Sequence, residues 1–508
     1  MSPSAHPAAA ALPPHLQPLL QTQRYPGGAQ QVELIETHIS WILLAGAHVY
    51  KIKKPLRLPF LDFSTLALRK RSCEDELRLN RRFAPDLYLD VLELRDAPGA
   101  GLQWGGGAGT VVDYAVHMRR FDEAGRLDHL CTRGALSAVH MSDLADALVR
   151  FHDTAAVAAA GSRFGAPAQI LAPALQNFDE LMGALLGPDT QQRLAALRRW
   201  TLEQHQALAG LMQQRQAQGR VRECHGDLHL ANMVLIDGRV RLFDCLEFSE
   251  DLRWIDVAAE VAFPCIDLLG HGQGGLANWL FDEVCSRSGD YDAARLLPFY
   301  LVYKALVRAK VQAIRAMQAL RGCEDALRWI ALAEQRVAQR RPHLVITHGL
   351  SGCGKTVASN RLLQDDARAR TLRLRSDVER RRLFGLERNQ RSGAALDGGI
   401  YDATAHQRVY AHLGDLAGML LAAGWSVIVD AAFLRRAERD DFRALAARCD
   451  AGFAILAPQA EIEELRRRIS ARLAVGTDAS EATLAVLERQ LQWIEPLDED
   501  ERGFLLDA

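Results

Sequence analysis

The sequence predicts a multi-domain α/β protein in which a bilobal part precedes a part built on a parallel α/β/α sheet. Its 508 residues exceed one ordinary domain and allow two to four separate cores. The stretch "LVITHGLSGCGKT" (344–356) is an apolar run followed by a glycine-rich loop. The stretch "ECHGDLHLANMVLIDGRVRLFD" (223–244) combines acids and an Asn with a predicted hairpin. Each stretch is typical of a phosphate-handling site, and the two belong to different folds.

Three segments are expected along the chain. Residues 1–23 are rich in Ala and Pro and are expected to form a disordered tail. A first domain covers 24–338, with a small lobe up to about residue 121, and a second domain covers 343–508. The junction "RVAQRRP" (336–342) ends a charged helical segment at a proline, and a buried-strand pattern follows it.

The composition excludes several classes of protein. The 61 Lys and Arg residues nearly balance 63 Asp and Glu residues, so no global charge attracts nucleic acid or an anionic membrane. No apolar run is long enough to span a bilayer, and the start lacks the basic region of a secretory signal. Nine scattered cysteines without a CxxC pair indicate reduced thiols. We therefore expect a cytoplasmic protein without a membrane partner. The sequence does not indicate its oligomeric state.

The loop "GLSGCGKT" matches the pattern G-x-x-x-x-G-K-T between a predicted strand and a predicted helix. Its glycines, Gly349, Gly352 and Gly354, allow the backbone N–H groups to turn toward phosphate oxygens. Lys355 is expected to reach the β- and γ-phosphates of ATP, and the Thr356 hydroxyl is expected to bind Mg²⁺. The alternative is a chance glycine-rich turn, which the order of strand, loop and helix argues against.

Two acids follow predicted strands in the same part. The strand "SVIVD" (426–430) places Asp430 at its carboxyl end, where a Walker B acid binds Mg²⁺. In "LRLRSDVERRRL" (372–383), Asp377 ends another short strand and is a candidate to orient or deprotonate the acceptor hydroxyl. The alternatives are a turn-capping Asp430 and an Asp377 that serves as a helix N-cap.

The segment "ELRRRISARL" (464–473) places Arg468 and Arg472 on one helix face. Arginines on a closing lid stabilise the negative charge of the transferring phosphate, although an Arg-rich helix can equally be a solvated face. Residues 343–500 resemble the small P-loop phosphotransferases, including gluconate kinase, the zeta-toxin kinases and polynucleotide 5'-kinases. Only the phosphate loop is a highly specific motif of that resemblance.

The motif H-G-D-x-x-x-x-N holds Asp227 and Asn232, and the hairpin after it turns at Asp-Gly before Asp244. Kinase-type transfer needs one carboxylate beside the acceptor hydroxyl, and an amide and a second carboxylate on Mg²⁺. We therefore interpret Asp227 as catalytic and Asn232 and Asp244 as metal ligands. The pattern resembles the aminoglycoside phosphotransferases and their choline- and fructosamine-kinase relatives, which also have "HGD" and an "FD" motif in place of DFG. That resemblance implies that Asp256, in "DLRWIDVAAE", supports the catalytic loop.

The small lobe should supply a phosphate-binding lysine paired with a helix glutamate. Lys51 is the preferred lysine over Lys53, and Glu76 the preferred partner over Glu74, in the helix that starts near a Ser-Thr cap. An exposed lysine on an edge strand is the competing interpretation. No G-x-G-x-x-G motif precedes the lysine, and the aminoglycoside-kinase relatives commonly lack this motif as well. Its absence therefore disfavours a protein kinase but not a member of that family.

Other polar residues near these motifs have weaker assignments. His152, on a predicted amphipathic helix, is expected to be a satisfied interlobe residue. The acids Glu247, Glu250 and Asp251 suit a polycationic acceptor such as an aminoglycoside, or else form a solvated turn.

Taken together, the tandem motifs resemble bacterial proteins in which an aminoglycoside phosphotransferase-like domain is fused to a P-loop domain. The resemblance implies a phosphotransferase with two ATP sites, Mg²⁺ and a small hydroxyl-bearing acceptor. A first alternative is that one domain binds nucleotide only to regulate the other. A second is a nucleic-acid 5'-hydroxyl kinase whose arginines, in 375–391 and 466–472, follow the phosphate backbone. The balanced total charge disfavours nucleic acid as a partner.

Overall fold

The computed structural model describes residues 12–25, 28–58, 61–320, 322–386, 402–475 and 483–506, with side chains up to 471 in the helix that ends at 475. The chain packs as two compact units. The first holds residues 1–136, 151–169 and 212–260, and the second holds 137–150, 170–211 and 261–508. Packing therefore groups residues 261–338 with the P-loop part. The predicted domain limits, 24–338 and 343–508, stay a prediction.

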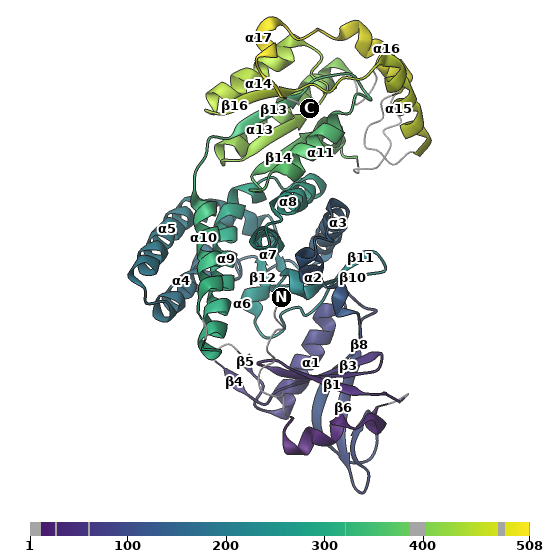
Figure 1. The fold of residues 1–508 in the computed structure, drawn as a ribbon, viewed down its shortest axis with the longest axis vertical. Coiled ribbons are helices and arrows are strands. Elements are labelled where there is room, and N and C mark those ends of the chain that lie inside the picture. Colours follow the sequence, from purple (N-terminus) through teal and green to yellow (C-terminus); the bar gives the residue numbers. More distant parts are fainter. Residues whose placement is uncertain are drawn as a thin grey trace. The chain divides into compact units, whose positions relative to one another are not determined.

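The first unit is built on a six-stranded antiparallel sheet, in the order β1-β2-β3-β8-β6-β7. Its strands are β1 (Val32–Glu36), β2 (Ser40–Ala45), β3 (His48–Lys53), β6 (Tyr88–Ala97), β7 (Gly101–Trp104) and β8 (Thr110–Arg119). Helix α1 (Leu66–Asn80) packs against β6 and β8 (Figure 1). The Thr65 hydroxyl accepts a hydrogen bond from the Leu68 amide, so it caps this helix as the sequence predicted.

The predicted disordered tail is wrong over residues 12–23, while residues 1–11 lie outside the described part. Pro14–Leu20 forms a 3-10 helix, in which Leu16 and Leu19 are buried. They pack in one hydrophobic cluster with Trp41 and Tyr50 of the sheet. The Ala- and Pro-rich composition concealed three leucines, Leu12 just before the helix and Leu16 and Leu19 within it, which are buried against the sheet.

The catalytic segment of the first unit consists of short strands and turns. Its hairpin joins β10 (Met233–Ile236) to β11 (Arg239–Leu242) through Asp237 and Gly238, which have φ of 49° and 72°. Positive φ at both residues is the geometry that an Asp-Gly turn favours. The remaining elements are β4 (Arg57–Leu58), β5 (Leu61–Asp62), α2 (Leu127–Thr132), β9 (Val221–Glu223), α6 (Glu250–Arg253), β12 (Trp254–Asp256) and the 3-10 turns Thr22–Arg24, Glu123–Gly125 and Leu230–Asn232.

The second unit contains a five-stranded parallel sheet, in the order β14-β15-β13-β16-β17. Its strands are β13 (His343–Thr347), β14 (Thr371–Arg375), β15 (Ser426–Asp430), β16 (Gly452–Leu456) and β17 (Leu505–Leu506). The connections between the strands place α11 (Lys355–Asp365) on one face and α13 (Ala403–Ala422) with α14 (Arg436–Arg448) on the other (Figure 1). The remaining helices of this part are α12 (Ser376–Leu383), α15 (Ile462–Val475), α16 (Leu484–Trp493) and α17 (Glu499–Arg502).

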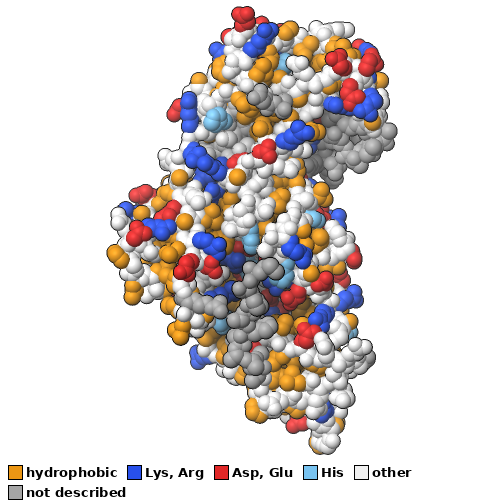
Figure 2. All heavy atoms as spheres, viewed as in Figure 1, with side chains coloured by type: hydrophobic (Ala, Val, Ile, Leu, Met, Phe, Trp, Pro, Cys, Tyr) orange, Lys and Arg blue, Asp and Glu red, His pale blue; other side chains and the backbone are white. Residues whose placement is uncertain are grey.

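Helices make up the rest of the second unit. They are α8 (Gly274–Ser288), α9 (Ala293–Gln318) and α10 (Glu324–Val337), together with the parts of α3 (Ala138–Thr154), α4 (Pro167–Ala184), α5 (Pro188–Ala217) and α7 (Val257–Gly270) that fall within it. Within the described ranges, no helix has both the length and the apolar character needed to cross a bilayer. Basic and acidic side chains are interspersed over the face drawn in Figure 2.

The two folds agree with the predicted class. An antiparallel sheet with one packed helix, followed by a catalytic loop and hairpin, is the order of a protein-kinase-like part. A parallel sheet whose first strand leads into a glycine loop is the order of a P-loop part.

Candidate active sites

The predicted lysine and glutamate of the small lobe meet in the first unit. Lys51 Nζ, on β3, donates to Glu76 Oε1 at 2.8 Å and to Asp244 Oδ1 at 2.6 Å. Burial opposes the charge on Lys51, but the carboxylates of Asp244 and Glu76 hold its pKa well above the ordinary value. The alternative partner, Glu74, lies 3.8 Å from Lys70 on the exposed side of α1. The structure therefore pairs Lys51 with Glu76.

Lys53 forms a second ion pair beside the first. Strand periodicity places it on the same face of β3 as Lys51. Its ammonium group contacts Glu76 and Glu247, and all three side chains are almost fully buried. Glu247 Oε1 also accepts a hydrogen bond from the Ser72 hydroxyl at 3.2 Å. The two lysines are thus not alternatives, because Glu76 binds both.

These contacts bear on the acids proposed for a polycationic acceptor. Glu247 is neutralised by buried Lys53 and is only 4% exposed, so that interpretation is wrong for this residue. Asp251 lies 3.0 Å from Arg163. Glu250 is exposed in the first turn of α6. The case for an aminoglycoside acceptor gains nothing from this turn.

Asp244 follows the hairpin in a conformation that the surroundings impose. Its φ is +61°, and its amide donates to the Tyr88 hydroxyl at 2.9 Å. The next amide, that of Cys245, donates to Asn80 Oδ1 at 2.8 Å. Burial alone would raise the pKa of Asp244, but the adjacent Lys51 ammonium lowers it to about 2. The carboxylate is therefore ionised at neutral pH and suited to binding a cation.

The catalytic loop brings Asp227 and Asn232 together. Asn232 Nδ2 donates to the Asp227 carbonyl oxygen at 2.9 Å and lies 3.5 Å from Asp227 Oδ2. The amide nitrogen of Asn232 therefore holds the loop closed, and its Oδ1 remains as the oxygen that can bind a metal. The Asp227 side chain is 39% exposed, as a group that must meet an acceptor requires.

A buried carboxylate that the sequence analysis did not name supports this loop. Glu260, on α7, accepts hydrogen bonds from the His225 amide at 2.7 Å and the Gly226 amide at 3.0 Å. The resemblance had implied this role for Asp256, but Asp256 instead binds Arg215 Nε and Nη2 at 2.7 and 2.8 Å and caps the Ala258 amide. The direct contacts with the catalytic loop thus come from Glu260, four residues after Asp256.

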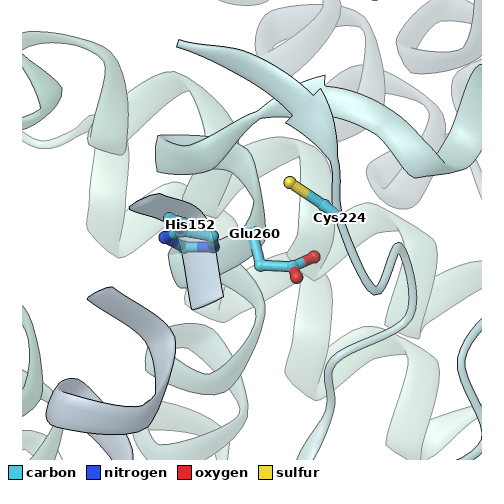
Figure 3. Close-up of side chains that lie close together, drawn as sticks. All are labelled: His152, Cys224 and Glu260. Carbon is cyan, nitrogen blue, oxygen red and sulfur yellow. The ribbon is translucent and has the colours of Figure 1, made fainter. Parts of the chain in front are cut away.

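Glu260 lies beside His152 and Cys224, with possible ligand atoms within 4.8 Å of one another (Figure 3). Two of the three already bind the backbone, since Glu260 accepts from the loop and the Cys224 thiol donates to the Ile255 carbonyl at 3.6 Å. Burial raises the pKa of the Cys224 thiol well above its usual range, which opposes metal binding. We interpret the cluster as an internal support of the loop.

His152 itself was expected to be a satisfied residue. It is buried, but its Nε2 has no hydrogen-bond partner among the described residues, so that expectation is wrong for this atom. Burial lowers the pKa of His152, and a neutral imidazole carries the smaller desolvation cost.

The phosphate loop of the second unit has the backbone that its glycines were predicted to allow. Gly349, Gly352 and Gly354 have φ of 139°, 87° and 102°. A Cβ on Gly349 would lie 2.9 Å from Cys353 Sγ, so the loop also requires a residue without a side chain at this position. Lys355 Nζ donates to the Gly349 and Leu350 carbonyls, each at 2.8 Å, at the start of α11.

The two predicted metal ligands of this site are in contact. The Thr356 hydroxyl donates to Asp430 Oδ2 at 2.9 Å, at the carboxyl end of β15. Asp377 was expected to end a strand, but β14 ends at Arg375 and Asp377 lies in the first turn of α12. The helix N-cap is Arg375, so Asp377 is not the cap. Arg375 and Asp430 are register partners, which places Asp377 near the same edge of the sheet.

Of the two lid arginines, one can be placed. Arg468 Nη1 donates to the Gly352 carbonyl at 3.3 Å, and its Nε donates to Glu464 at 2.6 Å. Helix α15 therefore lies against the phosphate loop. The side chain of Arg472 lies outside the described residues. Gln490, on α16, was not singled out by the sequence, and its Oε1 accepts a hydrogen bond from the Ser351 amide of the loop at 2.8 Å.

Both donor sets suit Mg²⁺, which prefers oxygen ligands. Asp244 and Asn232 would hold the ion in the first unit, and Thr356 and Asp430 would hold it in the second. The anionic Asp244 beside Lys51 and the amide-lined loop before Lys355 fit a metal-bound triphosphate.

Several supporting residues escaped the sequence analysis for a common reason. Tyr88, Asn80 and Gln490 bind the sites from distant elements, and their residue types carry no motif. Glu260 could have been considered, because it is the next acid after Asp256 in the segment "DLRWIDVAAE" that the resemblance already covers.

Comparisons with known proteins follow the same division. Residues 344–497 match the AAA domain family AAA_33. The N-terminal region is similar to the solved structure of amicoumacin kinase hAmiN in complex with AMP-PNP, Ca²⁺ and Ami, with 11% identity and a TM-score of 0.38 over 60% of this chain and 89% of that one. It is also similar to a choline/ethanolamine kinase family protein from Mesorhizobium loti, with 13% identity and a TM-score of 0.37 over 63% of this chain and 92% of that one. A gluconokinase from Sinorhizobium meliloti 1021 is also similar, with 19% identity and a TM-score of 0.23 over 33% of this chain and 82% of that one.

Similarity along nearly the whole chain comes from mycobacteria. Uncharacterized proteins of Mycobacterium tuberculosis (strain ATCC 25618 / H37Rv) and of Mycobacterium bovis (strain ATCC BAA-935 / AF2122/97) are each 30% identical over 468 residues, which is 91% of this chain and 91% of each relative. The match covers both units, including the catalytic loop and the phosphate loop. The chain therefore belongs to the same family as these mycobacterial proteins.

Proposed function

We propose that the chain is an ATP-dependent phosphotransferase with two ATP sites, each of which transfers the γ-phosphate of ATP to a hydroxyl group of a small molecule in the presence of Mg²⁺. The observation that carries the proposal is the contact of Lys51 with both Glu76 and Asp244. It joins the cation expected to bind phosphate to the carboxylate expected to bind metal. The contact between Thr356 and Asp430 supports the same role for the second site.

In the first site, Lys51 binds the α- and β-phosphates, and Glu76 with Lys53 fixes its position. Asp227 accepts the proton of the acceptor hydroxyl as the acceptor oxygen bonds to the γ-phosphorus. The bond from that phosphorus to the β–γ bridging oxygen breaks, and ADP leaves with the electron pair. The bound metal would neutralise phosphate charge. Glu260 keeps the loop backbone, and with it Asp227, in place.

In the second site, the amides of the phosphate loop and Lys355 bind the β- and γ-phosphates. Asp377, in the first turn of α12, orients or deprotonates the acceptor hydroxyl. Arg468, whose Nη1 donates to the Gly352 carbonyl of the loop, binds the oxygens of the transferring group. The bonds made and broken are the same as in the first site. The two sites thus perform one type of reaction on two unrelated folds.

The test is transfer of labelled γ-phosphate to a panel of aminoglycosides, sugars, small alcohols and 5'-hydroxyl oligonucleotides. It uses the wild-type chain, Asp227→Ala and Lys355→Ala. We expect each substitution to remove a different product or one step of a sequence, with a loss of at least about 10²-fold. Loss of all transfer in one variant, with only a changed rate in the other, would contradict two catalytic sites and favour a nucleotide-gated regulator.

The regulatory alternative is less well supported, because each site keeps the full set of residue types that transfer needs. The 5'-hydroxyl kinase is disfavoured by the total charge of −2. If it were correct, the oligonucleotides of the panel would be phosphorylated and transfer would fall steeply with salt.

We place the protein in the cytoplasm. Its nine cysteines are free thiols, and seven are buried, as suits a reducing compartment. A small hydroxyl compound is the proposed partner, and neither a membrane nor a nucleic acid is part of the proposal.

A further inference from the structure

Helix α8 packs against the P-loop part, although it lies outside residues 343–508. It contacts β14, the edge strand of the parallel sheet, and α11, the helix that follows the phosphate loop. Both elements belong with α8 to the second unit. In the predicted division of the chain, α8 was part of the other kinase domain.

Two side chains of α8 bind the free edge of β14. Asn278 Oδ1 accepts from the Thr371 amide at 3.1 Å, and Asp282 Oδ1 accepts from the Arg373 amide at 2.6 Å. Four residues of a helix rise about 6 Å and two residues of a strand rise about 6.6 Å. The acceptors of α8 therefore match the spacing of the edge amides, so that α8 covers this edge of the sheet.

The start of α8 approaches the P-loop part too closely for any side chain. A Cβ on Gly274 would lie 1.8 Å from the Ala367 carbonyl oxygen, and one on Gly275 would lie 1.8 Å from the Gln364 carbonyl oxygen. Asn278 Nδ2 also donates to the Leu363 carbonyl at 3.0 Å. The two backbones thus pack so closely that glycine is required at both positions of α8.

From Asp282, a chain of buried polar contacts leads to the predicted metal ligands. Arg373 Nη2 lies 3.6 Å from Asp282 Oδ2, and its Nη1 donates to the Ser359 hydroxyl at 3.2 Å and to Asn360 Oδ1. The Ser359 hydroxyl oxygen lies 3.4 Å from Asp430 Oδ2 and 3.1 Å from the Thr356 carbonyl oxygen. Asp282, Arg373 and Ser359 are all at least 97% buried, so water does not screen these contacts.

We propose that Asp282 is a positioning residue of the P-loop site, which acts through Arg373 and Ser359 to orient Asp430 and Thr356 for a divalent cation. The inference rests on the proposed use of metal-bound ATP at that site. It assigns α8, which lies within the predicted range of the first kinase domain, an indirect, positioning role at the second site. Outer contacts of this kind orient the ligands of a metal and set its affinity.

The experiment measures nucleotide binding by the full chain carrying Lys51→Met and Asp227→Asn, so that binding reports the P-loop site. In this background, Asp282→Asn keeps an oxygen for the Arg373 amide but removes the charge. The matched control is Glu283→Gln, which removes the neighbouring buried acid, paired with Arg287 at 2.7 Å on α8 itself. ATP affinity is measured in EDTA and across a Mg²⁺ titration.

We expect Asp282→Asn to raise the Mg²⁺ concentration for half-maximal binding about tenfold, with unchanged ATP affinity in EDTA and no shift for Glu283→Gln. Ser359→Ala should give a similar shift, and the double variant should not add the two. Equal weakening with and without Mg²⁺, or additive effects, would overturn the proposal in favour of a purely structural role. If Lys355→Ala left binding unchanged, the proposed function of the P-loop site would fail first. Dependence on Lys355 with an inert Asp282→Asn would overturn only this inference.

Discussion

Lys51 and Lys53 lie on one face of β3 and share Glu76, yet their surroundings assign them different roles. Lys51 reaches Asp244, whose side chain is 46% exposed, whereas Lys53 reaches Glu247, which is 4% exposed. The first lysine faces the predicted nucleotide side, and the second neutralises buried acids.

Substitution should separate these roles. Lys53→Met leaves two buried carboxylates with one cation fewer, and breaking a buried pair costs about 3–5 kcal/mol. We expect chemical denaturation to show a loss of that order for Lys53→Met. Lys54→Met, whose partner Glu36 is partly exposed, should lose less than about 1 kcal/mol. Equal losses for the two variants would show that the buried network does not stabilise the lobe.

The pH dependence of stability follows from Asp244. Its pKa is lowered from 3.8 to about 2 in the folded chain, where burial opposes ionisation but Lys51 favours it. A lowered carboxyl pKa contributes stability that is present above the unfolded value of 3.8 and is lost as pH falls toward 2. We expect the wild-type chain to exceed Asp244→Asn in unfolding free energy at pH 7, with the difference shrinking between pH 4 and pH 2. Denaturant titrations at several pH values test this, and a constant difference would contradict it.

Gln490 competes with phosphate for one amide of the loop. Its side chain accepts from the Ser351 amide, which a bound phosphate would also use. Releasing one hydrogen bond is worth about 0.5–1.5 kcal/mol, so Gln490→Ala should tighten nucleotide binding about two- to tenfold. Calorimetric titration with ATP tests this. The exposed Gln492→Ala, on the same helix, should leave affinity unchanged. Weaker binding by Gln490→Ala would mean that the side chain supports the loop.

At the scale of elements, the contact between α8 and the P-loop part depends on two glycines. Gly275→Ala should destabilise the second unit by about 1–3 kcal/mol, because the added carbon would overlap the Gln364 carbonyl. Gly414→Ala, inside α13, meets only Phe442 at 4.0 Å and should be neutral or stabilising, since alanine favours a helix. Thermal unfolding of both variants provides the comparison. Similar melting temperatures would contradict the close fit.

The elements also show what sequence can predict. The Thr65 cap, the Asp-Gly hairpin and the strand before the phosphate loop were predictable, because each depends on residues within a few positions. The tail at 12–23 was not, because its leucines gain burial only against Trp41 and Tyr50 of the sheet. Local signals specify elements, while burial against distant elements decides whether a weak signal folds.

For the whole molecule, the packing units and the predicted domains differ, which bears on truncation. A chain that begins at 343 lacks α8 and would expose the edge amides of Thr371 and Arg373. We expect it to aggregate or to unfold at a lower temperature than a chain that begins at 261, which keeps α8 and should stay monomeric. Circular dichroism melting and light scattering distinguish the two. A stable, monomeric 343–508 would show that α8 is dispensable for folding.

The same division explains how far the sites were predictable. Motifs of fixed spacing located Asp227, Asn232, Lys355 and Thr356, because the backbone near each residue sets the geometry. The sequence favoured Lys51 over Lys53, but it did not indicate that both lysines bind Glu76, because that glutamate lies on another element. Asp282 had no motif at all, since its partner Arg373 lies 91 residues away.

The glycines at the start of α8 limit how this protein can be recombined. A P-loop part from another kinase could pack against α8 only if its backbone leaves the same space beside Gly274 and Gly275 as Ala367 and Gln364 do here. A transplant of the P-loop part would therefore have to include α8, with its acceptors Asn278 and Asp282. During divergence of the family, substitutions at Asp282 and at Arg373 should occur together, because these two side chains form an ion pair.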